Sequence, residues 1–328
     1  MKPPQVSVII PAYQSHDTIA SCLQTLRAQT YRDFETIVVD SSPDARCEQI
    51  VRGDFPETLF VRSPVRLLPQ AARNRGAELA RGFLFVFTDP DVSFDPRWLE
   101  ELVRSHQQSG DPISGAIDCF GSRWLDQGIH LCKFSKWLPG GSPRPIDSAP
   151  TCNLLVTRAL YEAIGGFRDD EFLGDLVFSW DALRRGERLV FEPAAVVFHE
   201  HRHRIGSFLR ERFERGILFA GVRIRWHGGR RATALFYLAV SALPIRYPRI
   251  LALVAGQAWR AGWRRRYFST FPLFAAGHAA SLAGECLGYV RFLIGHRTAE
   301  GASPTSVAPR PACDASGAQQ GRVPAEPP

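Results

Sequence analysis

The feature that most constrains the fold is a series of short apolar runs, several of which end in proline or acidic residues. They lie at residues 6–11, 36–39, 59–61, 83–87, 154–156 and 189–198. Runs of this length that are rich in β-branched and aromatic residues predict buried strands. Apolar residues at helical spacing lie between them, for example over 71–80 and 158–164. Strands separated by such helices predict an α/β fold, a mostly parallel sheet with helices on both faces.

Polar residues are expected to begin several of the helices. Ser15 or Asp17 can cap the first helix, whose apolar residues run over 19–26. Asp175 can cap a helix over 176–183. Such side chains accept hydrogen bonds from the free backbone N–H groups of the first helical turn.

Acidic residues gather where the predicted strands end. Asp40 ends the second strand, and Asp89 and Asp91 follow the fourth. Ligands of parallel, helix-covered sheets bind outside the carboxyl ends of the strands. The chain has neither a glycine-rich dinucleotide fingerprint nor a P-loop, so a bound phosphate needs a metal. Two carboxylates one residue apart suit Mg²⁺ or Mn²⁺, although Asp-Pro turns also occur without metal.

Charge divides the chain into a front and a rear part. Residues 1–201 carry a net charge of −6, whereas residues 202–297 carry +14 with seventeen arginines. The rear part is also apolar and aromatic, a composition that suits a membrane surface or a nucleic acid. A solvated basic helix is the alternative interpretation.

The rear part is expected to be helical and associated with a membrane. Apolar residues recur at helical spacing from 205 to 224 opposite arginines, which is typical of a helix in a bilayer interface. Apolar stretches follow at 232–245, 250–259 and 267–294. The first two are shorter than a spanning helix requires, and the third contains proline and charged residues. In-plane or re-entrant helices are therefore expected, with a helical hairpin as the alternative.

Three regions follow from this pattern: a catalytic domain at 1–201, a basic helical region at 202–297 and a disordered tail at 298–328. The tail is rich in Pro, Ala, Ser and Gly without periodicity. Residues 112–150 show no pattern that predicts regular structure.

The seven cysteines form no C-x-x-C pair, which favours a reducing compartment. The first apolar run is too short for a signal peptide, so the front domain is expected in the cytoplasm.

Eight short motifs, in order, resemble those of the family 2 glycosyltransferases. Four lie in the first hundred residues: Val6-Ser-Val-Ile-Ile-Pro-Ala-Tyr13, Glu35-Thr-Ile-Val-Val-Asp40, Ala72-Arg-Asn-Arg-Gly76 and Phe85-Val-Phe-Thr-Asp89-Pro-Asp91. Four follow: Gly165-Gly-Phe167, Phe172-Leu-Gly-Asp175, Arg185-Gly186 and Val196-Val-Phe-His199. The resemblance covers about residues 5–201. It implies a GT-A fold, a nucleotide-sugar donor, a divalent metal and inversion at the anomeric carbon.

The resemblance also implies roles for residues of the donor side. Pro11, Tyr13 and Asp40 match positions that line the pocket for the base and ribose of the donor. Arg73 lies where the family often holds the donor, the alternative being a solvent-exposed charge on a helix.

The metal site is implied in the same way. Asp89 and Asp91 resemble the metal-and-diphosphate pair of the family, with Asp91 as the more direct ligand. His199 matches a histidine that completes the metal shell in some members, the alternative being a capped surface histidine.

Asp175 matches the general base of the family, which takes the proton of the acceptor hydroxyl as that oxygen attacks. Here the usual Glu-Asp pair is Gly174-Asp175. The Gln-x-x-Arg-Trp signature of polymerising members is absent, so transfer of single sugars is expected.

The leading hypothesis is a metal-dependent, inverting glycosyltransferase on the cytoplasmic face of the cell membrane. It would use Mn²⁺ or Mg²⁺, a nucleotide-sugar donor and a lipid-linked or cell-envelope glycan acceptor. One alternative keeps the enzyme but gives it a soluble acceptor. Another is a catalytically silent scaffold that binds nucleotide-sugars. Nucleic-acid binding is not expected, because apolar and aromatic residues interrupt the arginines.

Overall fold

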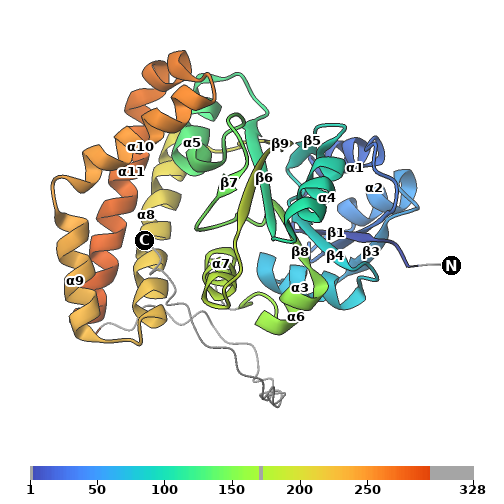
Figure 1. Ribbon diagram of the computed structural model, residues 1–328, viewed down its shortest axis with the longest axis horizontal. Coiled ribbons are helices and arrows are strands. Elements are labelled where there is room, and N and C mark those ends of the chain that lie inside the picture. Colours follow the sequence, from blue (N-terminus) through green and yellow to red (C-terminus); the bar gives the residue numbers. More distant parts are fainter. Residues whose placement is uncertain (1–2, 170–172, 296–328) are drawn as a thin grey trace.

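The computed structural model describes residues 3–169 and 173–295 (Figure 1). Its sheet has the strand order β3-β2-β1-β4-β8-β6-β9-β5. The first four strands in this order are β3 (Leu59–Arg62), β2 (Phe34–Asp40), β1 (Val6–Ala12) and β4 (Leu84–Thr88). They pair in parallel, as the sequence predicts.

The other half of the sheet is mixed, which corrects the prediction of a mostly parallel sheet. Its strands are β8 (Asn153–Thr157), β6 (Ile113–Cys119), β9 (Val190–His199), β5 (Val92–Phe94) and the short β7 (Arg144–Pro145). Strand β8 runs antiparallel to both β4 and β6, and β9 is antiparallel to β5 and β7. The chain reaches β8 through the connection over 120–152, which reverses its direction instead of making a parallel crossover.

Side-chain alternation along the strands builds a core on each face of the sheet. Val6, Val8 and Ile10 of β1 pack with α1 (Ile19–Arg27), α2 (Arg46–Asp54) and α4 (Trp98–Ser109). Ile9 and the aromatic side chains of β4 pack on the other face. The helices there are α3 (Pro69–Leu79), α6 (Arg158–Ile164) and α7 (Gly174–Arg184). The prediction of helices on both faces is confirmed.

Two capping predictions are wrong. Helix α1 follows Thr18, and the Ser15 carbonyl, not a side chain, accepts hydrogen bonds from the N–H groups of Thr18 and Ile19. Helix α7 begins one residue before Asp175, so that residue lies within the first turn. Its Oδ1 accepts a hydrogen bond from the Leu176 N–H at 2.9 Å.

The segment over 112–150, which sequence patterns left unassigned, contributes β6, α5 (Trp124–Phe134), a 3₁₀ turn at Ser135–Trp137 and β7. Helix α5 faces the rear of the molecule, where Ile129 and Leu131 join a core with Phe208, Val254 and Phe274. It therefore connects the sheet to the rear helices.

The rear helices are α8 (Ile205–Trp226), α9 (Arg231–Ala242), α10 (Arg246–Arg260) and α11 (Arg264–Leu293). Helix α8 lies between α11 and the sheet (Figure 1). Phe208, Ala220 and Ile224 of its predicted apolar face are buried in the protein. These three side chains have protein partners, whereas Ile205 at the start of the helix is 48% exposed. Contact of this helix with a bilayer stays a prediction. The boundary at 202 stays a prediction, and the tail over 298–328 lies outside the described residues.

Among the described helices, none is both long and apolar enough to cross a membrane by itself. Helices α9 and α10, which meet at a bend of 68°, reach that length and composition only as a pair.

Glycines allow α8 and α11 to approach closely. A Cβ added at Gly284 would lie 1.9 Å from the Phe213 carbonyl oxygen, and one at Gly216 would lie 2.1 Å from that of Ser281. Beside this contact the buried carboxylate of Glu285 accepts hydrogen bonds from Arg223 of α8 and Arg246 of α10. Backbone contact and a shared carboxylate thus hold the rear helices together.

We expect Gly284→Ala to destabilise the protein by about 1–3 kcal/mol, because the new methyl group must push backbone apart. The matched control is Gly256→Ala in α10, where no atom lies within 4 Å of an added Cβ. That exposed change should raise stability by up to about 1 kcal/mol through helix propensity. Chemical denaturation of both variants is the measurement, and equal stabilities would contradict the close contact of α8 and α11.

Candidate functional site

Two carboxylates lie where β4 ends and the chain turns into β5. The Asp89 carboxylate forms an ion pair with the Arg73 guanidinium of α3. The Asp91 Oδ1 faces the Nε2 of His199, at the end of β9, across 3.9 Å. Asp89, Asp91 and His199 offer ligand atoms that all lie within 4.8 Å of one another. The structure thus brings together the three residues that the sequence assigns to a metal.

The chemistry of this group fits a divalent cation. Burial raises the pKa of Asp91; the His199 side chain opposes this effect and the Asp89 carboxylate adds to it. A bound cation would offset the cost of keeping these two carboxylates charged. Two carboxylates and an imidazole suit Mn²⁺ or Mg²⁺.

His199 is oriented by its backbone surroundings. It pairs with Val92 of β5, and its Nδ1 lies 2.8 Å from the carbonyl oxygen of Glu200. A carbonyl only accepts, so Nδ1 donates this hydrogen bond and Nε2 is the nitrogen that faces Asp91 and that would bind a metal. His199 is 8% exposed, which excludes the alternative of a surface histidine.

Two further histidines, which sequence patterns did not single out, lie behind His199. The ring of His201 stacks on that of His199, with centroids 5.0 Å apart. His130 of α5 donates from Nε2 to the Ile117 carbonyl oxygen, and its Nδ1 lies 3.0 Å from His201 Nε2. Burial lowers the pKa of His130 to about 3. These neutral rings support the end of β9 from the side of α5.

Asp175 lies near the metal candidates, although it comes from another helix. The buried Cys152 reveals this: burial raises its pKa, and the carboxylates of Asp89, Asp91 and Asp175 raise it further. All three carboxylates therefore lie within electrostatic reach of one buried side chain just before β8. Because Asp175 Oδ1 accepts the Leu176 N–H, its Oδ2 is the oxygen left for a substrate.

Arg73 is 3% exposed, which excludes the alternative of a solvent-exposed helix charge. Its guanidinium also donates to the side-chain oxygen of Gln70 at 3.3 Å. Arg73 thus holds Asp89, and a direct contact between Arg73 and the donor stays a prediction.

The residues assigned to the base and ribose lie at neighbouring strand ends. Pro11 and Asp40 are buried, and Ala12 pairs with Asp40 across β1 and β2. The Asp40 Oδ1 accepts the Ser42 hydroxyl at 2.6 Å, and burial raises the pKa of this carboxyl. Tyr13 is 37% exposed. The three residues lie along one edge, and their donor roles stay predictions.

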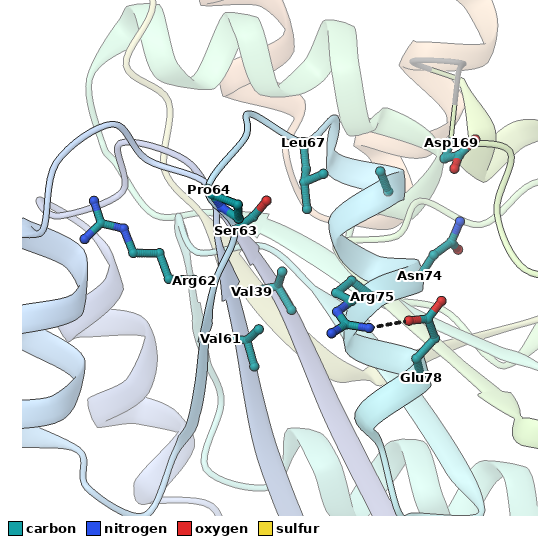
Figure 2. A pocket seen from close by; sticks show the side chains of 11 residues that line it. Val39, Val61, Arg62, Ser63, Pro64, Leu67, Asn74, Arg75, Glu78 and Asp169 are labelled. Carbon is teal, nitrogen blue, oxygen red and sulfur yellow. Dashed lines mark hydrogen bonds and ion pairs between the residues drawn. The ribbon is translucent and has the colours of Figure 1, made fainter. Parts of the chain in front are cut away.

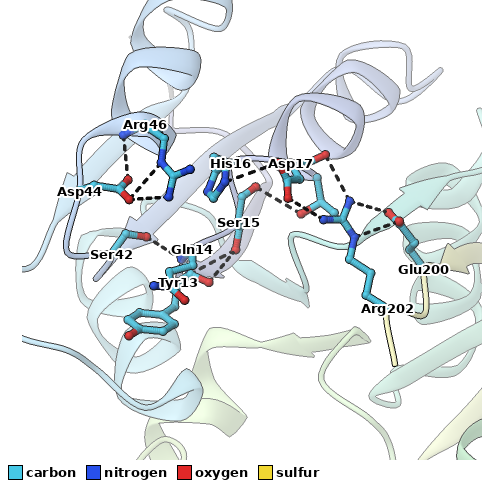
Figure 3. Close-up of polar contacts among 11 residues, drawn as sticks. Tyr13, Gln14, Ser15, His16, Asp17, Ser42, Asp44, Arg46, Glu200 and Arg202 are labelled. Atoms are coloured by element: carbon cyan, nitrogen blue, oxygen red, sulfur yellow. Dashed lines mark hydrogen bonds and ion pairs between the residues drawn. The ribbon is translucent and has the colours of Figure 1, made fainter. Parts of the chain in front are cut away.

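A network around the β1–α1 loop ties the two sides of the site together (Figure 3). The Gln14 N–H donates to Ser42 Oγ at 2.7 Å, and Gln14 has a φ of 52°. Across the site, Arg202 donates to the carboxylates of both Asp17 and Glu200. The loop after β1 is therefore bound to the segment after His199.

A pocket of about 370 Å³ opens beside β2, β3 and α3. Figure 2 shows Val39, Val61, Asn74 and Asp169 among the side chains around it. Of the residues that the sequence assigns to the donor, none lines this pocket. Two of the residues that line it, Val39 and Asn74, are sequence neighbours of Asp40 and Arg73. The volume of the pocket falls at the lower end of the range for ligand pockets.

The rear helices add charged side chains to the site, which sequence patterns did not predict. The Lys133 ammonium of α5 lies 3.2 Å from Glu211 of α8, and its charge reaches Asp91. Four residues along α8, Arg215 is half-buried and its charge reaches Asp175. The sequence signal for these two residues is their spacing: Glu211 and Arg215 are four residues apart, which places them on one face of a helix.

The sequence profile of Glycosyl transferase family 2 matches residues 7–148. Glycosyltransferase AglE of Haloferax volcanii is 28% identical over 220 residues, which cover 65% of this chain and 72% of AglE. A glucosyl-dolichyl phosphate glucuronosyltransferase of the same organism is 23% identical, over 34% of this chain and 36% of that protein.

Among solved structures, that of GalNAc-T7 with UDP, GalNAc and Mn²⁺ matches with a TM-score of 0.51 at 16% identity. The match covers 61% of this chain and 44% of that protein, and it shows the GT-A type of fold. With its motifs in order and its strand-end acids gathered, residues 7–148 match glycosyltransferase family 2, and the chain is a glycosyltransferase.

Proposed function

We propose that this glycosyltransferase moves one sugar from a nucleoside-diphosphate donor to an acceptor hydroxyl, with inversion and with a divalent metal. The acceptor is a lipid-linked or cell-envelope glycan at the cytoplasmic face of the membrane. One observation carries the proposal: Asp89, Asp91 and His199 gather within 4.8 Å, and Asp175 lies near them on α7.

Asp89, Asp91 and His199 would hold the metal. When bound, the metal supplies positive charge that offsets the charge developing on the leaving diphosphate. Arg73 fixes Asp89 by an ion pair, and the Glu200 carbonyl fixes the tautomer of His199. Both contacts keep the ligand atoms oriented before the donor binds.

Asp175 receives the proton. As the acceptor oxygen forms a bond to the anomeric carbon, the bond from that carbon to the diphosphate oxygen breaks. The acceptor proton passes to Asp175 Oδ2, because Oδ1 is engaged by the Leu176 N–H. Attack from the side opposite the leaving group inverts the anomeric carbon.

The comparisons support the choice of substrates. GalNAc-T7, which shares the fold, has UDP, GalNAc and Mn²⁺ in its structure. The glucuronosyltransferase relative is named for a glucosyl-dolichyl phosphate substrate, which is a lipid-linked sugar. A nucleotide-sugar donor and a lipid-linked acceptor follow by analogy.

Exposed apolar and basic side chains of the rear helices support membrane association. Leu235 and Phe236 of α9 and Phe268 of α11 are each more than half exposed. Arg264 and Arg265 are exposed at the start of α11. Apolar side chains that enter the headgroup region and arginines that attract anionic lipids together favour a membrane surface.

A donor panel tests the transfer reaction. We expect release of the nucleoside diphosphate from one donor in the presence of Mn²⁺ or Mg²⁺, and its loss with EDTA. Asp175→Asn should lower kcat by about 10²- to 10⁴-fold, because the general base is removed. Asp91→Asn should weaken metal binding, which is measured by titrating the metal.

The control is Asp54→Asn, an exposed carboxylate on α2, which should leave release unchanged. Donor binding without turnover, even with membrane extract as the acceptor source, would favour the silent scaffold. Full activity on a water-soluble acceptor without lipid would favour the soluble-acceptor alternative.

Gly174, which replaces the usual glutamate, allows α7 to approach α3. A Cβ there would lie 2.8 Å from Gln70 Cγ and 2.9 Å from the Arg168 carbonyl oxygen. Gly174→Ala should therefore shift Gln70 or the first turn of α7 and lower kcat by about 10- to 100-fold. Steady-state kinetics checks this, with Gly53→Ala, which meets nothing within 4 Å, as the control. Unchanged kcat in Gly174→Ala would show that the close approach does not position Asp175.

Vesicle co-sedimentation tests the membrane surface. The double variant Arg264→Ala, Arg265→Ala should bind vesicles of anionic phosphatidylglycerol about 30-fold more weakly, since each arginine contributes about 1 kcal/mol. The control pair Arg52→Ala, Arg75→Ala removes two exposed charges of the front domain and should change nothing. Equal binding to neutral phosphatidylcholine vesicles would contradict the attraction by charge.

A further inference from the structure

A cationic side chain of α8 lies beside the candidate base and has no partner. Arg215 is half-buried. Over residues 3–169 and 173–295, no hydrogen bond or ion pair engages its guanidinium. The carboxylates of Asp175 and Glu211 act on Arg215 through space but form no ion pair with it among the described residues, so a ligand that brings an anionic group into direct contact with the guanidinium would be stabilised there.

The packing of α7 on α8 fixes where Arg215 points. Leu176 and Val177 of α7 form a core with Phe219 and Val222 of α8. Arg215 precedes Phe219 by four residues, so it lies one helical turn along the same face. That turn places it at the start of α7, where Asp175 precedes Leu176 and its charge reaches Arg215.

The electrostatics agrees with this placement. Burial lowers the pKa of Arg215, and the Asp175 carboxylate opposes that effect. Arg212, one turn earlier, donates to the Ser281 hydroxyl at 3.1 Å and lowers the pKa further by its own positive charge. Toward Asp91, the next charged pair is Lys133 with Glu211. Within residues 3–169 and 173–295, Arg215 thus presents a guanidinium with no hydrogen bond or ion pair on the side of the site where Asp175 lies.

We propose that Arg215 binds an anionic group of the acceptor, a phosphate or a carboxylate, and so selects negatively charged acceptors. This rests on the proposed function, because it assigns the acceptor side by the position of Asp175. The metal ligands on β4 and β9 serve the donor diphosphate, so one anion is held at each end of the site. The shared chemistry is an oxyanion that accepts two N–H bonds from a guanidinium.

Equilibrium binding without turnover tests this. The full chain, in detergent and saturated with Mn²⁺ and a nucleoside diphosphate, is titrated with matched anionic and neutral probes. Decyl phosphate against decyl glucoside tests a lipid phosphate, and methyl glucuronide against methyl glucoside tests an acidic sugar. In Arg215→Ala, binding of one anionic probe should weaken about 10- to 100-fold, as expected for a charge-assisted bidentate contact. Binding of its neutral counterpart should change less than twofold.

Two variants on the same helix sharpen the result. Arg210→Ala removes an exposed arginine of α8 and should leave all four titrations unchanged. Arg215→Lys keeps the charge without the planar fork and should restore part of the lost affinity. The probe that loses affinity identifies the source of the anion.

Equal weakening by Arg210→Ala and Arg215→Ala, or equal loss for anionic and neutral probes, would overturn the proposal. Failure of the proposed function has a different signature, because the wild-type chain would then release no nucleoside diphosphate from any donor. Donor hydrolysis without acceptor should survive in Arg215→Ala, which separates an acceptor contact from damage to the donor side.

Discussion

The site depends on two partly buried carboxylates where β4 ends. Carboxylates that leave water need partners of opposite charge or hydrogen-bond donors. Arg73 meets this need for Asp89, and His199 lies opposite Asp91. Each partner comes from a different part of the chain, α3 and the end of β9. The order of the strands brings both elements close to the end of β4. The chain must therefore fold correctly for these carboxylates to find their partners.

Charged groups of the site are then positioned by features without charge. Gly174 lets the first turn of α7 approach Gln70, whose side chain contacts Arg73. The neutral pair of His130 and His201 supports the strand that ends in His199. The positions of the side chains at the site therefore depend on the packing of residues that lie directly behind them.

The sequence predicted the front domain well because its signals are local. Buried parallel strands are continuous apolar runs, and their ends carry the acids that belong to the site. Helix starts were predicted less well: backbone carbonyls cap α1, and Asp175 lies inside its helix. The antiparallel direction of β8 was not predicted. It results from the long connection before this strand, which is rich in Gly, Pro and Ser and has no hydrophobic periodicity.

The charged residues contributed by α5 and α8 could not be predicted from local pattern. Arg215 stands far from the strand-end motifs in the sequence, and only the docking of α8 against α7 brings it close. Lys133 comes from α5, where it forms an ion pair with Glu211 of α8. Helix α8 itself has the apolar pattern of an interfacial helix. Pattern alone does not say whether a helix or a lipid covers that face, and here the partner is α11.

The glycine contact between α8 and α11 has a geometric consequence. One side of α8 faces α7 beside Asp175, and the other lies against the backbone of α11 through Gly216 and Gly284. No side-chain layer separates the two helices there, so the face of α8 beside the site is coupled directly to the helix that carries the exposed arginines. An enzyme held on a membrane by the rear helices would keep its active site at a constant distance from the lipid surface. It would glycosylate hydroxyls at one fixed height above the lipid, and each added sugar would lift the new chain end out of reach.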